Sequence, residues 1–582
     1  MSFNKIIISL LIAAFAIGCG STSKVAVKEP ASSSKGKKEL SEEESINLKY
    51  LFVNANKEKI LGNFDKAADL FAQCIRIDGS NDAAMFELAK IYLEKKQIND
   101  ALFFAKSAYQ IDPSNVWYRL FLADLYMAAK KGSEGEAIYS ALFKDYPHNV
   151  DYAFKYASAL LYNGKIQEAI KVYDLVEEEI GINQELIIEK ERLWLRLGKV
   201  DKAAMEVEKL INKDPANLRS YSLLVELYQV NNMPEKAYET IQRMQQINSQ
   251  SPYVYLALAE YYRSNNQKDK SFEQLKLAFG SKELEQDLKV KIISSYLPIV
   301  EGNPEMLDQS LVLSKIMAET HPNDAISLAI YGDFLTIAQR FEEAEKQYLA
   351  SLTFDTKNVV VWQQLLVCQA QLNNFAGILK SSEEAISLFP DQSIFYLYNG
   401  VALTDAKRND EAAKSLLAGS KLVVDNDYQL KEFYVRLADN YNTLKNYPES
   451  DKFYEKALKL DPKDPLVLNN YSYYLSLRKE NLERAAEMSK LSNDLRPDQP
   501  SYLDTYGWIL YVQGKYDDAR IWIQKAIDKG GGENGTILEH MGDIMFKLGN
   551  AESALDYWKK AKAAGDAGDF IDKKISDKKL YE

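Results

Sequence analysis

The stretch LAKIYLEKKQINDALFFAKSAYQIDP, residues 88–113, decides the fold of this chain. Its apolar residues recur at intervals of three and four, which is the period of one face of a helix. Ala89 and Ala101 place a small side chain in each of two such runs. The stretch ends at Pro113, which cannot continue a helix. It therefore predicts two short helices joined by a tight turn.

The same pattern returns along the chain at a fixed spacing of about 34 residues, which is typical of stacked helical hairpins. By this register, copies start near Leu48, Asp82, Val116, Val150, Gln184, Leu218, Pro252, Gln286, Ala325, Val359, Ser393, Lys431, Pro465, Pro500 and Gly535. One hairpin cannot bury its apolar face alone, so its neighbours complete the core. The repeat predicts an all-α fold, a right-handed α-solenoid of about fifteen hairpins.

Small side chains mark where the two helices of each hairpin approach closely. On the second helix of the first hairpins these residues are Ala67, Ala101, Ala137, Ala169, Ala203 and Ala237. A larger side chain at such a position should overpack the pair and cost roughly 1–3 kcal/mol.

These residues resemble the tetratricopeptide repeat (TPR) family over nearly the whole chain that follows the N-terminal segment. In that family the first helices line a concave groove that holds a protein or peptide. Carried over by position, the resemblance implies that this groove contains Trp117, Phe154, Tyr253, Tyr473, Asp504, Trp508, Tyr511, Asp543 and Phe546. Aromatic groups contribute strongly to interfaces, and the two Asp residues would favour a basic segment. Alternatively, Trp508 and Tyr511 pack as core between neighbouring helices.

The period divides the repeats into two arrays, residues 42–285 and residues 325–568. Between them, residues 286–324 form a longer unit without the small residues, and Pro298 and Pro304 interrupt it. It is either a hinge or a rigid, degenerate repeat. Residues 569–582 predict a capping helix that hides the last apolar face. At the other end, Ser41 and Glu44 fit a helix capping box.

The N-terminus predicts export. Residues 1–18 have a basic start at Lys5 and an apolar run over 6–17, as in a secretory signal peptide. The run is too short to span a bilayer as a helix. Gly18-Cys19 resembles the lipobox of bacterial lipoproteins, so residues 19–41 would be a lipidated Cys19 and a disordered tether. The resemblance implies a lipid anchor in the outer membrane, facing the periplasm. An ordinary cleaved signal with an incidental cysteine is the alternative.

Charge and composition argue against several kinds of site. The formal charge is −12, and an acidic chain is poorly suited to nucleic acid. The three histidines lie far apart in the array, so no metal site is expected. Cys74 and Cys368 are expected to be buried as small hydrophobic residues. Residues 530–535 match a dinucleotide-binding pattern, but they follow a helix and predict a long turn. We therefore expect no cofactor and no enzyme activity.

The last hairpins indicate a more specific group. Residues 469–471, 502–508 and 538–543 look like long TPR lipoproteins of bacterial envelopes. One member type is an adaptor that presents substrates, such as cell-wall hydrolases, to an envelope protease. The resemblance favours a non-enzymatic periplasmic scaffold or adaptor. The alternatives are an accessory lipoprotein of an outer-membrane secretion or gliding apparatus and, from another class, an enzyme or enzyme regulator.

Overall fold

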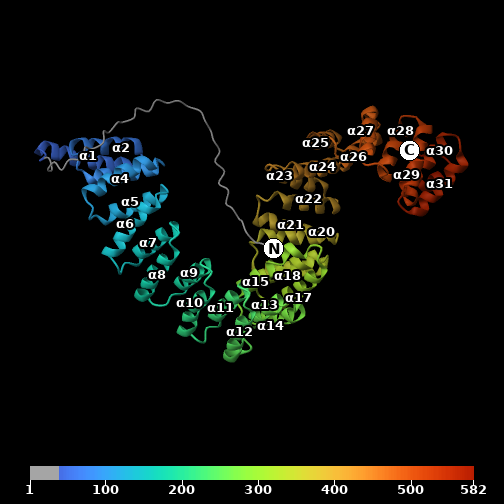
Figure 1. Cartoon of the computed structure of the whole chain (residues 1–582). Helices are drawn as coiled ribbons and strands as arrows, with labels where there is room; N and C mark the ends of the chain where they lie inside the picture. Colours follow the sequence, from blue (N-terminus) through green and yellow to red (C-terminus); the bar gives the residue numbers. More distant parts are fainter. Residues whose placement is uncertain (1–38, 582) are drawn as a thin grey trace. The chain divides into compact units, whose positions relative to one another are not determined.

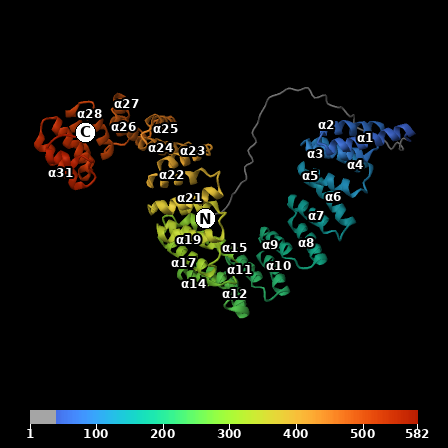
Figure 2. The ribbon, with the colours of Figure 1, turned by 180° about the vertical axis from the view of Figure 1, so that it is seen from behind.

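The computed structural model describes residues 39–581, and within that range it contains helices and no strand. These residues form two compact units that divide between Asn265 and Asn266. In each unit, consecutive helices lie side by side along the chain (Figure 1, Figure 2). Between residues 39 and 581, no helix is both long enough and apolar enough to cross a bilayer. The all-α solenoid predicted from the period is confirmed.

The first unit consists of short helices of similar length. They are α1 (Glu42–Ile60), α2 (Phe64–Ile77), α3 (Asp82–Glu94), α4 (Ile98–Ile111), α5 (Val116–Ala128), α6 (Gly132–Asp145), α7 (Val150–Tyr162), α8 (Ile166–Ile180), α9 (Gln184–Arg196), α10 (Val200–Lys213), α11 (Leu218–Val230), α12 (Pro234–Asn248) and α13 (Pro252–Ser264).

The second unit begins irregularly and then resumes the repeat. Its helices are α14 (Lys268–Gly280), α15 (Gln286–Ser294), α16 (Leu297–Val300), α17 (Pro304–Thr320), α18 (Ala325–Ile337), α19 (Phe341–Phe354), α20 (Val359–Gln371), α21 (Phe375–Leu388), α22 (Ser393–Asp405), α23 (Asn409–Ser420), α24 (Asp427–Thr443), α25 (Tyr447–Leu460), α26 (Pro465–Arg478), α27 (Leu482–Leu495), α28 (Pro500–Val512), α29 (Tyr516–Asp528), the 3₁₀ helix η1 (Gly531–Glu533), α30 (Gly535–Lys547), α31 (Ala551–Ala564) and α32 (Ile571–Asp577).

The predicted hairpin starts coincide with observed helix starts except for the first and the twelfth. There, α1 begins at Glu42 and α24 at Asp427, ahead of the predicted Leu48 and Lys431. Polar caps set these boundaries. In five successive repeats, an Asn side chain accepts a hydrogen bond from the backbone of the helix that follows: Asn81, Asn115, Asn149, Asn183 and Asn217. Such a cap satisfies an otherwise unpaired N–H of the first turn.

The turn between the two helices of a hairpin requires one residue with a left-handed backbone. Gly164 has φ +76°, and Lys130, one period earlier, has φ +60°. Glycine adopts this conformation freely, whereas a residue with a Cβ is strained there. The helix therefore ends at the same place in each repeat even where no glycine is present.

Close packing at the small-residue position holds each hairpin together. Ala101 and Ala169 are fully buried, as the period predicts. The prediction for Ala137 was wrong, because its side chain is not buried. Gly135 takes that position, one period after Ala101, and a Cβ there would lie 2.8 Å from Met127 Sδ. Because the small residue in this repeat is a glycine, the nearest alanine was taken for it, two positions too late.

A polar contact that we did not anticipate also joins the two helices of several hairpins. An Asp on the first helix accepts a hydrogen bond from a ring donor fifteen positions later on the second helix. The pairs are Asp124–Tyr139, Asp333–Tyr348, Asp439–Tyr454 and Asp543–Trp558. Each of these Asp residues thereby keeps a partner, which offsets its desolvation.

The irregular unit at 286–324 shares an apolar cluster with the helices on either side of it, and this cluster includes Phe279 on α14, Ile293 and Leu313. Beside this cluster, Lys289 on α15 is fully buried. Its Nζ donates to the carbonyl oxygen of Ser281 at 2.7 Å and lies 2.8 Å from His321 Nε2. Burial lowers the pKa of Lys289 to about 8.

The ends of the described chain follow the sequence predictions in part. The Ser41–Glu44 capping box is present at α1. The predicted C-terminal helix exists as the shorter α32, on which Ile571 is buried. Cys74 and Cys368 are buried free thiols, and residues 530–535 form a turn around η1. The predicted signal peptide, Cys19 and most of the tether lie outside the described residues.

Candidate functional site

A pocket of about 660 Å³ opens among α26, α28, α30 and the C-terminal segment. Three of its lining residues come from the ninth position of first helices: Tyr473, Trp508 and Asp543. Because the repeat returns the same helix position to the same face, residues one repeat apart in sequence converge here. Two further aromatic residues, Phe570 and Tyr581, enter from the C-terminal segment.

A stack of three rings forms one wall of this pocket. The Trp508 ring lies 4.0 Å from the His540 ring and 4.8 Å from the Tyr511 ring, measured between centroids, and both contacts are nearly parallel. Tyr511 is buried and Trp508 is half-buried. The Trp508 indole nitrogen is itself buried and has no hydrogen-bond partner among the described residues. Stacking on two sides leaves mainly the ring edges of Trp508 available to a ligand.

The carboxylates in this region face inward. Asp504 Oδ1 lies 2.8 Å from His540 Nδ1, and both side chains are buried. Burial disfavours the imidazolium, but the Asp504 carboxylate outweighs burial and raises the pKa of His540. The expectation that Asp504 attracts a basic partner is therefore not supported, because its charge is engaged by a neighbouring helix.

Asp543 is engaged in the same way by α32. Lys574 Nζ lies 2.7 Å from Asp543 Oδ2 and 2.8 Å from Glu539 Oε1. Asp543 Oδ1 also accepts from Trp558 Nε1 at 2.8 Å. Burial raises the pKa of Asp543, although Lys574 opposes this shift. The predicted charge of Asp543 is thus used to hold the capping helix.

The role of Lys574 was not predicted from the sequence, which indicated only a capping helix at residues 569–582. A lysine beside Ile571 and Ile575 gives no sign of burial, because long cations usually keep their charge in water. Two acids four positions apart on the preceding first helix, Glu539 and Asp543, were the available signal. They share one helix face and so can bind one cation.

The other predicted groove residues are spread over both units. Trp117 on α5 is 72% exposed, and Phe154 on α7 is partly exposed with its ring 5.7 Å from the Tyr173 ring. Tyr253 on α13 is half-buried, and its hydroxyl accepts from Arg219 Nε at 2.9 Å. Phe546 on α30 is half-buried against Trp558. None of these four lines the pocket that contains Trp508.

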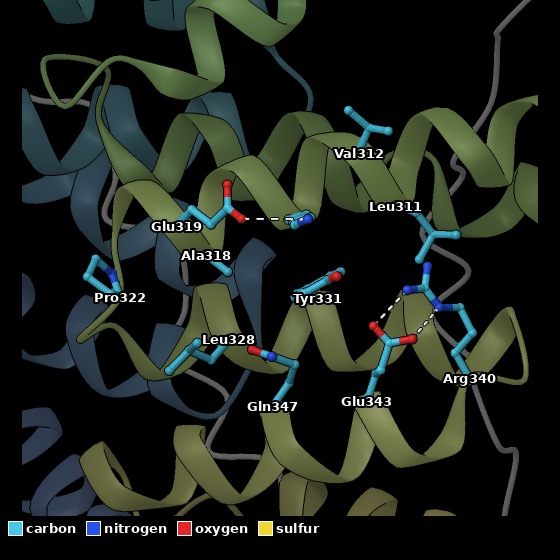
Figure 3. A pocket seen from close by; sticks show the side chains of 11 residues that line it. Leu311, Val312, Ala318, Glu319, Pro322, Leu328, Tyr331, Arg340, Glu343 and Gln347 are labelled. Atoms are coloured by element: carbon cyan, nitrogen blue, oxygen red, sulfur yellow. Dashed lines mark hydrogen bonds and ion pairs between the residues drawn. The ribbon is translucent and has the colours of Figure 1, made fainter.

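A second pocket, of about 560 Å³, lies among α17, α18 and α19. Figure 3 shows the Arg340 guanidinium facing the Glu343 carboxylate across its rim, with N–O distances of 2.6 and 2.7 Å. These charges pair within one turn of helix and are half-exposed, so they contribute little to stability. Among the described residues, Tyr331 is the one aromatic side chain that lines this pocket. The pocket at α26–α30 is therefore the stronger candidate for binding.

Comparison with known proteins agrees with the helix pattern. A tetratricopeptide repeat family model matches residues 60–105 and 93–153, and a second TPR model matches residues 431–464. These segments are tetratricopeptide repeats. Most helix pairs between and after them have similar lengths, and the exceptions include α15, α16 and α17.

Two curated proteins share local sequence similarity. A TPR repeat-containing protein of Pseudomonas aeruginosa is 29% identical over 150 residues, which is 25% of this chain and 24% of that protein. The human protein O-mannosyl-transferase TMTC1 is 29% identical over 152 residues, 26% of this chain and 17% of that protein. The chain thus spans about a quarter or less of the length of the curated relatives it matches.

Among solved structures, the chain is similar to those described as the APC/C hetero-tetramer Cut9-Hcn1 and as Naa15/Naa10 bound to HypK-THB. The first has a TM-score of 0.37 at 12% identity, covering 86% of this chain and 96% of that one. The second has a TM-score of 0.37 at 13% identity, covering 92% and 91%. The TPR repeats matched at residues 60–105, 93–153 and 431–464 imply a scaffold for protein–protein interaction.

Proposed function

We propose that this chain is a non-enzymatic adaptor that holds a peptide segment of another protein in the pocket at α26–α30. The observation that carries the proposal is the pocket itself. Its volume of about 660 Å³ lies in the range typical of ligand sites, and six aromatic residues line it: Tyr473, Trp508, Tyr511, Tyr516, Phe570 and Tyr581. Aromatic residues in a recess are where binding energy concentrates.

The chemistry of the pocket favours an apolar or aromatic anchor residue on the partner. The inward carboxylates Asp504 and Asp543 are matched by His540 and Lys574, so they offer little net charge to a basic segment.

We further propose that the adaptor acts in the bacterial envelope. Cys19 would be lipidated, and the tether would place the array in the periplasm at the outer membrane, where the chain presents bound proteins to an envelope protease. The signal-like residues 1–18, the Gly18-Cys19 pair and the sequence likeness of the last hairpins to adaptor lipoproteins support this proposal. Substitution of Cys19 by Ser should release the protein from membranes, and retention in the membrane fraction would contradict the anchor.

In-cell photo-crosslinking tests the pocket. A photoreactive amino acid at Leu477, which lines the pocket and is 50% exposed, should capture a specific protein. The same probe at Ile521 on α29, which is 51% exposed and does not line the pocket, is the matched control. Mass spectrometry would then identify the adducts found at 477 and not at 521.

The identity of the adducts separates the functions. A peptidase or cell-wall hydrolase captured from position 477 supports the protease adaptor. Components of a secretion pore or gliding motor would instead favour an accessory role in that apparatus. Equal labelling from positions 477 and 521 would contradict the pocket as the binding site.

A further inference from the structure

The first helix of the array leaves an apolar face uncovered. Five large side chains on and just after α1 are between 61% and 81% exposed: Ile46, Tyr50, Val53, Ile60 and Leu61. The first four recur at intervals of four, three and seven, so they lie along one side of the helix. The opposite side of α1 packs on α2. Nothing among residues 39–581 covers the outer stripe.

At the other end of the array, the last hairpin is covered by a capping helix. There α32 covers the end of the repeat with the buried Ile571, and Lys574 binds it to α30. Repeat arrays need such caps, because a terminal hairpin exposes the face that its missing neighbour would bury. The outer face of α1 has the composition of an interface and lacks a cap of this kind within the described residues. A contiguous patch of this sort marks an interaction site.

The charges along the stripe are arranged symmetrically about Tyr50. Glu43 precedes Tyr50 by seven positions and Lys57 follows it by seven. Ile46 and Val53 lie four positions before and three after Tyr50 on α1. Glu43 and Lys57 are both exposed. An antiparallel copy of the same helix, centred on Tyr50, would therefore set acid against base and apolar against apolar.

Two hollows beside Val53 fit the same antiparallel arrangement. A hollow of about 460 Å³ lies between Val53 and Ile60, and a second of about 280 Å³ lies on the other side of Val53, toward α3. In the antiparallel register, Ile46 of one copy falls beside Val53 of the other, at the edge of these hollows. A twofold interface must be self-complementary in this way, because each copy presents the same patch to the other.

We propose that the outer face of α1 binds a second copy of this chain, as an antiparallel α1–α1 pair on a twofold axis at Tyr50. A single helix pair buries less area than a standard stable interface, so we expect a weak, concentration-dependent dimer. Self-association through α1 would bring two copies of the pocket at α26–α30 into one assembly.

Sedimentation velocity of the purified full chain over a range of concentrations tests the pairing. The wild type should convert from monomer to dimer, and Val53→Glu should weaken the dimer by at least tenfold. Val230→Glu is the matched control, because Val230 is 73% exposed and Val53 is 66% exposed in the same unit. A monomer at every concentration up to the solubility limit would overturn the proposal. A dimer equally insensitive to both substitutions would overturn it as well.

Charge reversal and crosslinking test the register. Glu43→Lys alone and Lys57→Glu alone should each weaken the dimer several-fold, and the double variant should restore it, since opposite charges meet again. Tyr50→Cys should give a covalent dimer with a short bis-maleimide, whereas Val230→Cys should not. If the double variant is no better than the single ones, or if Tyr50→Cys gives no covalent dimer, the antiparallel register is wrong. Occupation of the face by the chain's own N-terminal segment would show as a monomer in every variant and would overturn the pairing.

Discussion

Replacing Lys289 by Met should stabilise the second unit at neutral pH, although it removes two polar contacts. Lys289 is fully buried on α15, and its partners among the described residues are the carbonyl of Ser281 and the ring of His321. No carboxylate in this part of the chain pairs with it. A buried cation without a counter-charge is unfavourable, which is why its pKa falls to about 8.

The size of the effect follows from this pKa. An ordinary lysine pKa lies near 10.4, so a folded-state pKa of about 8 corresponds to roughly 3 kcal/mol of destabilisation. Below pH 8 the proton is bound in both states, and the whole penalty applies. Between pH 8 and about 10.4 the unfolded chain binds the proton and the folded chain does not, so the unfolding free energy rises with pH. Methionine cannot make the hydrogen bond to Ser281, and this loss offsets about 1 kcal/mol of the gain in unfolding free energy.

We therefore expect Lys289→Met to raise the unfolding free energy of this region by about 1–2 kcal/mol at pH 7. By pH 10 the gain should vanish, because the wild-type amine is then neutral. Urea unfolding at both pH values, with hydrogen exchange at pH 7 to locate the change in α15 and α17, measures this. Lys291→Met, at an exposed position on the same helix, is the control. A variant less stable than wild type at pH 7 would refute the reasoning.

The same substitution should change the titration of His321. Burial lowers the pKa of His321, Lys289 and Lys282 add to this, and Asp324 opposes it. Removal of the Lys289 charge should raise the pKa of His321 toward its ordinary value, as followed by NMR of the imidazole protons. An unchanged His321 pKa would mean that Lys289 is already neutral at the pH of the titration.

Three further substitutions test the packing of the repeats, each by urea or thermal unfolding. Gly542→Ala should cost roughly 1–3 kcal/mol, because its Cβ would lie 2.5 Å from the Trp558 ring, whereas Gly532→Ala, with nothing closer than 3.7 Å, should change little. Gln339→Gly should raise the unfolding free energy by roughly 0.5–1 kcal/mol, because Gln339 has a left-handed backbone, φ +58°, that glycine adopts without strain. Lys574→Met should cost about 3–5 kcal/mol, since it leaves two buried carboxylates without their cation. Its effect should appear as faster proteolysis near α32.

The sequence predicted the fold well because its determinants are local and repeated. The apolar period, the small residues and the turn positions recur in every regular repeat, so an error in one copy, such as Ala137 for Gly135, is corrected by its neighbours. Features that occur in only one repeat are not visible in this recurring pattern. Lys289 and Lys574 look like surface lysines in sequence, and only the packing of a helix that departs from the repeat buries them.

The structure brings only some of the predicted groove residues together in one pocket, and their binding role stays a prediction. The repeat register brought Tyr473 and Trp508 to one face, where they line the pocket. The register could not show which polar side chains beside them already have partners within the chain. The partners of Asp504 and Asp543 come from the next hairpin and from α32. A carboxylate in a TPR groove therefore attracts a ligand only if the following repeat supplies no cation.

This dependence on the next repeat also limits how far a substitution acts. In a repeat array each hairpin contacts only its neighbours, so a local loss of stability spreads little. Lys574 reaches α30 and no other described first helix. Undocking α32 should therefore loosen the wall of the pocket formed by Phe570 and Tyr581 and leave the Trp508–Tyr511 stack on α28 in place. If Lys574→Met abolishes crosslinking from position 477 while α28 stays protected from exchange, the C-terminal segment is part of the binding site.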